Sequence, residues 1–280
     1  MINKRNIYYA MGPATRRLFR RLYFLPYDIF ERITGKRDAL TPPKGRVFIG
    51  SGDFVKHGNR ILSQFVELGG LKPTHRVLDV GCGIGRLAVP LTNYLDRDKG
   101  SYEGFDIVKS GIKWCQKNIQ TRYPNFNFTH INLRNELYNL KTDTRSTGFV
   151  FPYNNNEFDF VFLTSVFTHM MPEDVSSYLG QINRVLKPGG ICFSTFFVIN
   201  KESQELMAKN DVIKFDNKFD NYYLHNTKVK EANVAFDEKY LNKIINENGL
   251  KVIKKHYGYW SGREKENSVD FQDIYVLEKQ

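Results

Sequence analysis

The chain contains few cysteines and no long apolar run, and both features limit the functions open to it. Its three cysteines, Cys82, Cys115 and Cys192, are odd in number and widely spaced. They offer neither a disulfide framework nor a CxxC metal site, so we expect no metal and a reducing compartment. The basic N-terminus lacks an apolar stretch of signal length, and the longest apolar run, around residues 191–199, is too short to span a bilayer. We therefore predict a cytoplasmic protein.

One short stretch carries most of the functional information. Residues 77–90 are VLDVGCGIGRLAVP. Residues 76–80 have the β-branched, apolar composition of a strand buried on both faces of a parallel sheet. The three glycines that follow lack Cβ, so the backbone can turn tightly there, and a helix begins at Arg86 with its amides directed back into the turn. We expect a ligand at this strand end, with the Asp79 carboxylate aimed at it.

Two classes of ligand use such a loop. Gly83, Gly85 and Ala88 also fit the G-x-G-x-x-G/A fingerprint of dinucleotide-binding proteins, which alone is weak evidence. Asp79 distinguishes the two classes, because a carboxylate repels a pyrophosphate and attracts the ammonium and sulfonium groups of S-adenosylmethionine. The sequence favours S-adenosylmethionine as the cofactor.

The stretch resembles the first cofactor motif of the class I S-adenosylmethionine-dependent methyltransferases, and the resemblance covers roughly residues 72–197. Alternating strands and helices predict an α/β, doubly wound, Rossmann-like sheet. The resemblance implies a seven-stranded, mostly parallel sheet whose last strand is antiparallel. We predict strands over residues 76–80, 102–105, 127–131, 158–163, 191–198, 251–259 and 272–278, and helices over 86–94, 109–120, 172–186 and 237–248.

The same resemblance implies further contacts to S-adenosylmethionine, the methyl donor. Asp106 ends the second strand 23 residues after Gly83, at the spacing of an acid that binds both ribose hydroxyls. A helix N-cap is the alternative role for Asp106. Asn132 stands where the resemblance places an aspartate for the adenine amino group, and its amide oxygen can accept the same bond. The full set of predicted cofactor residues is Asp79, Gly81, Cys82, Gly83, Arg86, Asp106, Ile107, Asn132, Thr164 and Ser165.

Methyl transfer from a sulfonium needs mainly alignment and exclusion of water. If the acceptor is a hydroxyl, a base assists, and His169 after the fourth strand is our candidate; a structural histidine is the alternative. Two aromatic regions, residues 200–236 and 257–273, are candidates for the acceptor pocket, the first as a lid, and surface elaboration explains both equally well. The predicted acceptor residues are Tyr222, Tyr223, Trp260 and Arg263.

Positive charge is concentrated at the N-terminus. Residues 1–46 hold eleven Lys and Arg against three Asp and Glu, which accounts for +8 of the net charge of +11. Apolar residues recur there at helical spacing, although Pro26 should bend or break a single helix. This basic amphipathic extension has three interpretations: its aromatic face packs on the domain, residues 14–37 contact an anionic membrane, or it binds nucleic acid. The small excess charge elsewhere disfavours nucleic acid.

We predict a basic N-terminal extension over residues 1–50 and a methyltransferase domain over 51–280. The predicted function is methyl transfer from S-adenosylmethionine to a small-molecule or lipid-linked acceptor, most plausibly at oxygen. The alternatives are an RNA ribose methyltransferase and a non-catalytic partner that keeps the fold. The sequence leaves the oligomeric state open.

Overall fold

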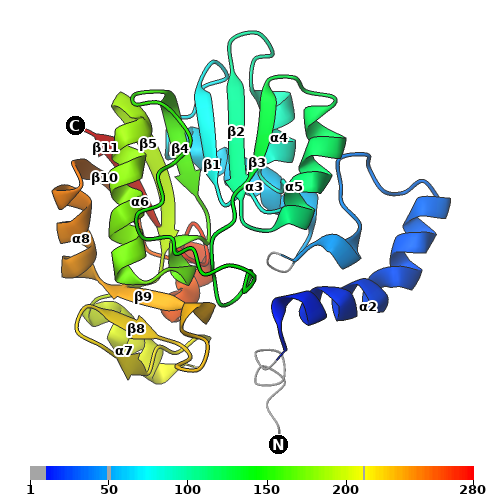
Figure 1. The fold of residues 1–280 in the computed structure, drawn as a ribbon. Helices are drawn as coiled ribbons and strands as arrows, with labels where there is room; N and C mark the ends of the chain where they lie inside the picture. The colour runs from blue at the N-terminus through cyan, green and yellow to red at the C-terminus, as the bar shows by residue number, and fades with distance from the viewer. Residues whose placement is uncertain (1–10, 49–51, 211) are drawn as a thin grey trace, which may run out of the picture.

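A seven-stranded sheet forms the centre of the computed structural model (Figure 1), which describes residues 11–48, 52–210 and 212–280. Its strands are β1 (Arg76–Val80), β2 (Ser101–Asp106), β3 (Phe126–His130), β4 (Phe158–Leu163), β5 (Leu186–Phe196), β10 (Leu250–His256) and β11 (Asp273–Lys279). They lie in the order β10-β11-β5-β4-β1-β2-β3. β11 is antiparallel to both of its neighbours, whereas β1 to β5 pair in parallel. The predicted fold, including its antiparallel last strand, is confirmed.

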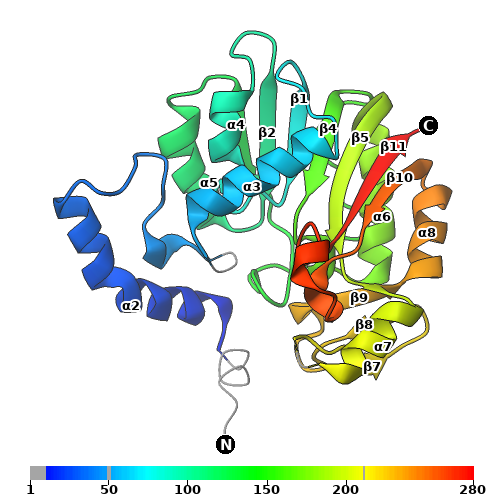
Figure 2. The ribbon, with the colours of Figure 1, turned by 180° about the vertical axis from the view of Figure 1, so that it is seen from behind.

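Helices cover both faces of this sheet. One face carries α3 (Phe54–Glu67), α4 (Ala88–Tyr94) and α5 (Lys109–Cys115), and the other carries α6 (Pro172–Val185) and α8 (Glu238–Glu247), as Figures 1 and 2 show from opposite sides. Each face has its own apolar cluster. Alternate residues of β4 join different clusters, Val161 the first and Phe160 the second, which is why this strand is apolar throughout.

Two predicted segments differ from expectation. Residues 200–236 do not form one long loop: they contain α7 (Lys201–Lys209) and, with β6 (Val198–Ile199), a small sheet of β7 (Asn217–Lys218), β8 (Tyr222–Leu224) and β9 (Val234–Asp237). The unit has its own apolar cluster around Phe197, Phe215 and Trp260. The helix predicted over 172–186 ends at Val185, and the strand predicted to begin at residue 191 already begins at Leu186.

The N-terminal extension is dominated by α2 (Pro13–Ile33), one helix of 21 residues. It runs through Pro26 without a break and curves along its length (Figure 1). Pro26 is exposed, so water can reach the carbonyl group that loses its partner there. The predicted domain boundary at residues 50 and 51 falls outside the described part of the chain. Among the described helices, none is long and apolar enough to cross a membrane.

The loop after β1 has the backbone geometry that only glycine adopts easily. Gly81 has a φ of 84°, and a Cβ added to it would lie 2.6 Å from Cγ2 of Val166. Left-handed backbone costs an L-residue about 1–2 kcal/mol, and the contact adds to that cost. The turn can therefore bring β1 and the segment after β4 close together only with glycine at this position.

We expect Gly81→Ala to lower the free energy of unfolding by about 2–4 kcal/mol. Gly70→Ala is the matched control, because Gly70 also has a positive φ, 67°, but nothing lies within 4 Å of its added Cβ. The control should cost only about 1 kcal/mol. Urea denaturation of both variants measures the difference, and equal losses would mean that Val166 yields without cost.

Candidate active site

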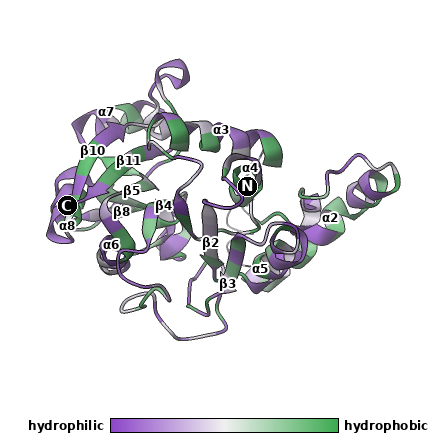
Figure 3. Cartoon of the chain, turned by 90° about the horizontal axis from the view of Figure 1, so that it is seen from above, coloured by the Kyte–Doolittle hydropathy of each residue, from purple (hydrophilic) through white to green (hydrophobic). Residues whose placement is uncertain are grey.

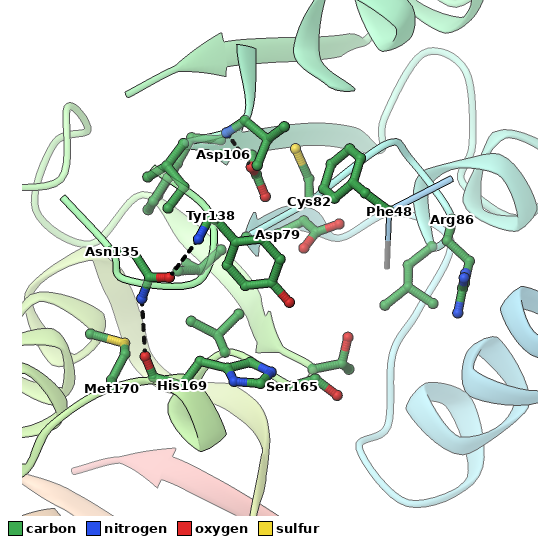
Figure 4. Close-up of a pocket in the computed structure, with 18 of the residues that line it drawn as sticks. Phe48, Asp79, Cys82, Arg86, Asp106, Asn135, Tyr138, Ser165, His169 and Met170 are labelled. Atoms are coloured by element: carbon green, nitrogen blue, oxygen red, sulfur yellow. Dashed lines mark hydrogen bonds between the residues drawn. The ribbon is translucent and has the colours of Figure 1, made fainter. Parts of the chain in front are cut away.

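A cavity of about 650 Å³ lies at the carboxyl ends of β1, β2 and β4. This volume is typical of small-molecule sites, and the position is where doubly wound sheets bind ligands. Figure 4 shows side chains from several segments converging on it. The lining residues come from the predicted cofactor loop and from five other regions: Phe48, His57, Arg60, Asp79, Val80, Gly81, Cys82, Arg86, Leu87, Phe105, Asp106, Ile107, Val108, Leu133, Arg134, Asn135, Tyr138, Ser146, Thr164, Ser165, Val166, His169, Met170, Tyr178, Tyr259, Asp270 and Phe271.

Two buried carboxylates line one wall of the cavity. Asp79 is 2% exposed, and its Oδ2 accepts a hydrogen bond from the Tyr102 hydroxyl at 2.6 Å. Asp106 is 9% exposed; its Oδ2 accepts from the Gly83 N–H at 2.8 Å and its Oδ1 from the Val108 N–H at 2.6 Å. Asp106 does not cap α5, whose N-cap is Val108. A carboxylate has about four lone-pair directions, so each keeps acceptor capacity for a ligand.

Burial makes these two charges unfavourable while the cavity holds no cation. The pKa of Asp79 is raised to about 8, mainly by burial and also by the nearby Asp106 carboxylate, while the hydrogen bond from Tyr102 opposes the rise. Burial also raises the pKa of Asp106, which the two backbone N–H donors partly offset. A cationic ligand would relieve the repulsion, whereas a pyrophosphate would add to it. The two buried carboxylates therefore suit the cationic S-adenosylmethionine.

The glycine loop folds back onto β2. The N–H groups of Gly81 and Cys82 both donate to the Phe105 carbonyl oxygen, at 2.9 and 3.1 Å. Gly81 and Cys82 line the cavity. Gly83 does not line it, but its N–H donates to Asp106, which does. Burial raises the pKa of the Cys82 thiol well above its usual value, so the thiol stays protonated. Cys82 thus fills space in the loop.

The wall beyond Asp106 is mainly apolar and contains Ile107, Val108 and Leu133. The neighbouring Asn132 is not among the lining residues, and its Oδ1 accepts a hydrogen bond from Asn139 at 3.1 Å. Asn135 does line the cavity, but its amide is engaged: Nδ2 donates to the His169 carbonyl oxygen at 3.2 Å. The residues near the expected adenine position are therefore displaced along the chain from the sequence prediction.

His169 belongs to the same cavity. It ends a short 3₁₀ turn, Phe167–His169, and its Nδ1 lies 3.0 Å from the Glu231 carbonyl oxygen. Because a carbonyl oxygen only accepts, Nδ1 carries the proton and Nε2 keeps its lone pair in the neutral ring. Burial lowers the pKa of His169, so the ring is neutral near pH 7. Hydrogen bonds to the backbone of Glu231 and Ala232 oppose this shift in the pKa of His169.

Ser165 lies beside His169 with a strained backbone. Its φ is 57°, unusual for a residue with a side chain. The conformation is held by two hydrogen bonds, from its N–H to Oγ1 of Thr195 at 2.8 Å and from its Oγ to Oε1 of Gln272 at 3.0 Å. Strain maintained in this way is common at functional sites. Thr164 and Ser165 both line the cavity, as the sequence predicted for the fourth strand end.

A basic wall faces the two carboxylates. Arg86 is 6% exposed, and burial with the nearby Arg20 lowers its pKa to about 10, so it stays charged at neutral pH. Figure 4 shows Arg86 on the Phe48 side of the cavity, away from Asn135. Arg60 pairs with Asp270 at 2.9 Å, and burial lowers the pKa of His57 to about 4, helped by both arginines. The same cavity is thus lined by the Asp79 and Asp106 carboxylates and by the charged Arg86 side chain.

The four predicted acceptor residues lie elsewhere. Trp260 is fully buried and donates from Nε1 to Oδ2 of Asp273 at 2.7 Å. Tyr223 is 7% exposed and packs in the small unit, while Tyr222 stacks on Phe219. Arg263 pairs with Glu202 in a separate surface hollow. No described residue from 200–236 lines the cavity; the aromatic lining comes instead from Phe48, Tyr138, Tyr259 and Phe271, among others.

Comparisons with known proteins agree with this geometry. Residues 78–194 match the family described as methyltransferase domain. A phthiotriol/phenolphthiotriol dimycocerosates methyltransferase of Mycobacterium ulcerans is 34% identical over 130 residues, which are 46% of this chain and 39% of that protein. The chain thus aligns with about two fifths of that relative's length.

Solved structures share the fold at low sequence identity. A Pyrococcus horikoshii protein aligns with a TM-score of 0.56 at 14% identity, over 84% of this chain and 95% of that one. A Burkholderia thailandensis 1,6-didemethyltoxoflavin-N1-methyltransferase, solved with its substrate and S-adenosylhomocysteine, aligns with a TM-score of 0.51 at 13% identity, over 96% of this chain and 91% of that one. These alignments support the fold.

Proposed function

We propose that this chain, a class I S-adenosylmethionine-dependent methyltransferase by its domain and fold, methylates a hydroxyl group of a small-molecule or lipid-linked acceptor. One observation carries the proposal: a neutral histidine with Nδ1 bonded to a backbone carbonyl lines the same cavity as the two buried carboxylates. Two carboxylates that suit the cationic methyl donor and a base that suits a hydroxyl acceptor therefore line the same cavity.

We assign the donor to Asp79, Asp106 and the loop between them. Asp79 would attract the positively charged methionine end, and Asp106 would accept hydrogen bonds from the ribose hydroxyls. Arg86 would pair with the donor carboxylate from the opposite wall. Ile107 would contact the adenine, with Thr164 and Ser165 near the methionine end. S-adenosylmethionine supplies an already activated methyl group, so the protein's task is alignment.

His169 acts on the acceptor. Its Nε2 accepts the hydroxyl proton while the acceptor oxygen forms its bond to the methyl carbon and the sulfur–methyl bond breaks. The bond from Nδ1 to the Glu231 carbonyl oxygen orients the ring and stabilises the imidazolium that results. The apolar walls exclude water from this step.

A lipid-linked acceptor is favoured among the candidates. The relative from Mycobacterium ulcerans is named for a lipid substrate, and the cavity has apolar walls that suit an amphiphilic molecule. Such an acceptor would be met at a membrane surface, and we propose a cytoplasmic location for the protein. The acceptor side would be built by Tyr138, Tyr259 and Phe271, which line the cavity.

We expect His169→Gln to lower methyl transfer about 100- to 10,000-fold with donor affinity unchanged within about twofold. Purified protein is incubated with methyl-labelled donor and total lipid, RNA or small-molecule extracts, and the labelled product is identified by mass spectrometry. His225→Gln is the matched control, because His225 Nδ1 also bonds a backbone carbonyl, that of Lys214 at 2.7 Å, but does not line the cavity. Full turnover by His169→Gln would eliminate the base. Label confined to RNA would favour the ribose methyltransferase, and donor binding without labelled product would favour a non-catalytic partner.

A further inference from the structure

The helix α2 exposes a continuous apolar face. Leu18, Leu22, Leu25, Ile29 and Ile33 recur at intervals of three or four residues and are 47–79% exposed. Phe19, Tyr23 and Phe30 widen the same face and are 54–79% exposed. We call these eight residues the outer face of α2. Figure 3 shows the helix standing away from the body of the molecule.

The opposite side of α2, which faces the rest of the chain, is polar. Arg17 donates to the Tyr138 carbonyl oxygen at 3.2 Å and Arg20 to the Lys44 carbonyl oxygen at 3.3 Å. The Asp28 carboxylate accepts from the backbone N–H groups of Lys44 and Gly45, at 2.7 and 3.0 Å. Only Pro13 and Arg16 of the helix are buried. A surface helix normally turns its apolar stripe inward, and α2 does the reverse.

The charge around the outer face of α2 indicates which kind of partner can bind there. Exposed Arg21 and Arg32 lie on α2, within a segment that carries +8 over residues 1–46. A second copy of the chain would bring two such segments together, and their repulsion disfavours self-association. Nucleic acid would match the charge but offers no apolar layer for eight large side chains. Anionic lipid headgroups above an acyl layer match both properties.

We propose that the outer face of α2 inserts into the interfacial layer of a bilayer rich in anionic lipids, with the helix axis parallel to the membrane surface. Docking in this way would bring the cavity close to the lipid, because Tyr138, whose carbonyl oxygen accepts from Arg17, lines the cavity. Delivery of a lipid-linked acceptor rests on the proposed function; membrane docking itself does not.

Vesicle binding tests the proposal. The purified full chain is sedimented with phosphatidylcholine vesicles that contain either 40% or no phosphatidylglycerol, at two salt concentrations. We expect binding that is at least about tenfold stronger with the anionic lipid and that weakens with salt. Leu18→Gln/Leu22→Gln, which keeps the net charge, should bind the anionic vesicles at least about tenfold more weakly than the wild type.

A matched control tests whether the loss of binding is specific to the outer face of α2 or follows from the removal of any exposed apolar side chains. Val150→Gln/Ile253→Gln also replaces two exposed apolar side chains, 62% and 40% exposed, but away from α2. It should bind vesicles like the wild type, and all variants should bind S-adenosylmethionine equally, which verifies folding. Equal vesicle binding by the two double variants, or a wild-type dimer that the α2 variant dissociates, would overturn the proposal. Vesicle binding without any labelled lipid would leave docking intact and contradict only the proposed acceptor.

Discussion

The Asp79→Asn variant is expected to bind S-adenosylmethionine about 100-fold more weakly than the wild-type protein. The substitution preserves shape and an acceptor for the Tyr102 hydroxyl, and it removes only the charge that faces the donor. Hydrogen bonds and contacts to charged groups contribute about 1.5–3 kcal/mol, which corresponds to roughly one to two powers of ten in affinity. Calorimetry with the donor measures the loss. Unchanged affinity would mean that Asp79 does not meet the cation.

The same residue should link donor binding to pH. With a pKa raised to about 8 by burial, Asp79 is mostly protonated at pH 7 in the empty protein. A cationic donor favours the charged form, so binding should release close to one proton at pH 7, and affinity should rise between pH 6 and about 8. Calorimetry in buffers of different ionisation enthalpy counts the proton. Asp79→Asn serves as the control and should release almost none.

The stability of the protein without bound donor should depend on pH in the opposite direction. A folded-state pKa above the unfolded value means that stability is full at low pH and declines as Asp79 ionises between about pH 4 and 8. Asp79→Asn should therefore raise the unfolding free energy at pH 8 by more than about 1 kcal/mol while it weakens donor binding. If Asp79→Asn stabilises the protein and weakens S-adenosylmethionine binding, the Asp79 charge serves ligand binding at a cost in stability.

Sequence periodicity predicted those parts of the fold that repeat a simple rule. β1, β2 and β4 are short apolar runs, and the acids at the ends of the first two strands were located because parallel strands place their carboxyl ends together. The spacing from Gly83 to Asp106 was meaningful for the same reason: the Gly83 N–H donates directly to that carboxylate. Local sequence was therefore sufficient to place Asp79 and Asp106 at one cavity.

Side-chain direction outside regular elements could not be predicted in the same way. Trp260 and Tyr259 are adjacent, yet Trp260 turns into the apolar cluster because its Nε1 bonds Asp273, while Tyr259 lines the cavity. The length of the loop after β3 likewise gave no indication that Leu133, rather than Asn132, would reach the cavity. His57 and Arg60 were missed because only the second half of α3 has a clear apolar period. These positions depend on tertiary packing that no short pattern encodes.

The Asp106→Ala variant should lose more donor affinity than Asp79→Asn, about 1,000-fold. Alanine removes the proposed acceptor of two ribose hydroxyls, and it also leaves the Gly83 and Val108 N–H groups without their present partner in a buried site. The glycine loop would then lose one of the bonds that hold it against β2. Stability should fall as well, by about 2–4 kcal/mol, which thermal or urea unfolding measures.

The two roles of Asp106 are separable with a second variant and a second ligand. Asp106→Asn keeps one acceptor oxygen, so it should preserve part of the stability through one of the two backbone N–H bonds while losing the charge assistance toward the ribose. Wild-type protein should bind S-adenosylhomocysteine about 10- to 100-fold more tightly than its 2′-deoxy analogue, and Asp106→Asn should reduce this preference severalfold. A purely structural Asp106 would leave the preference untouched in the asparagine variant. Because the backbone N–H groups and the ribose hydroxyls are different partners of one carboxylate, the stability measurement and the ribose preference together distinguish a loop anchor from a ligand contact.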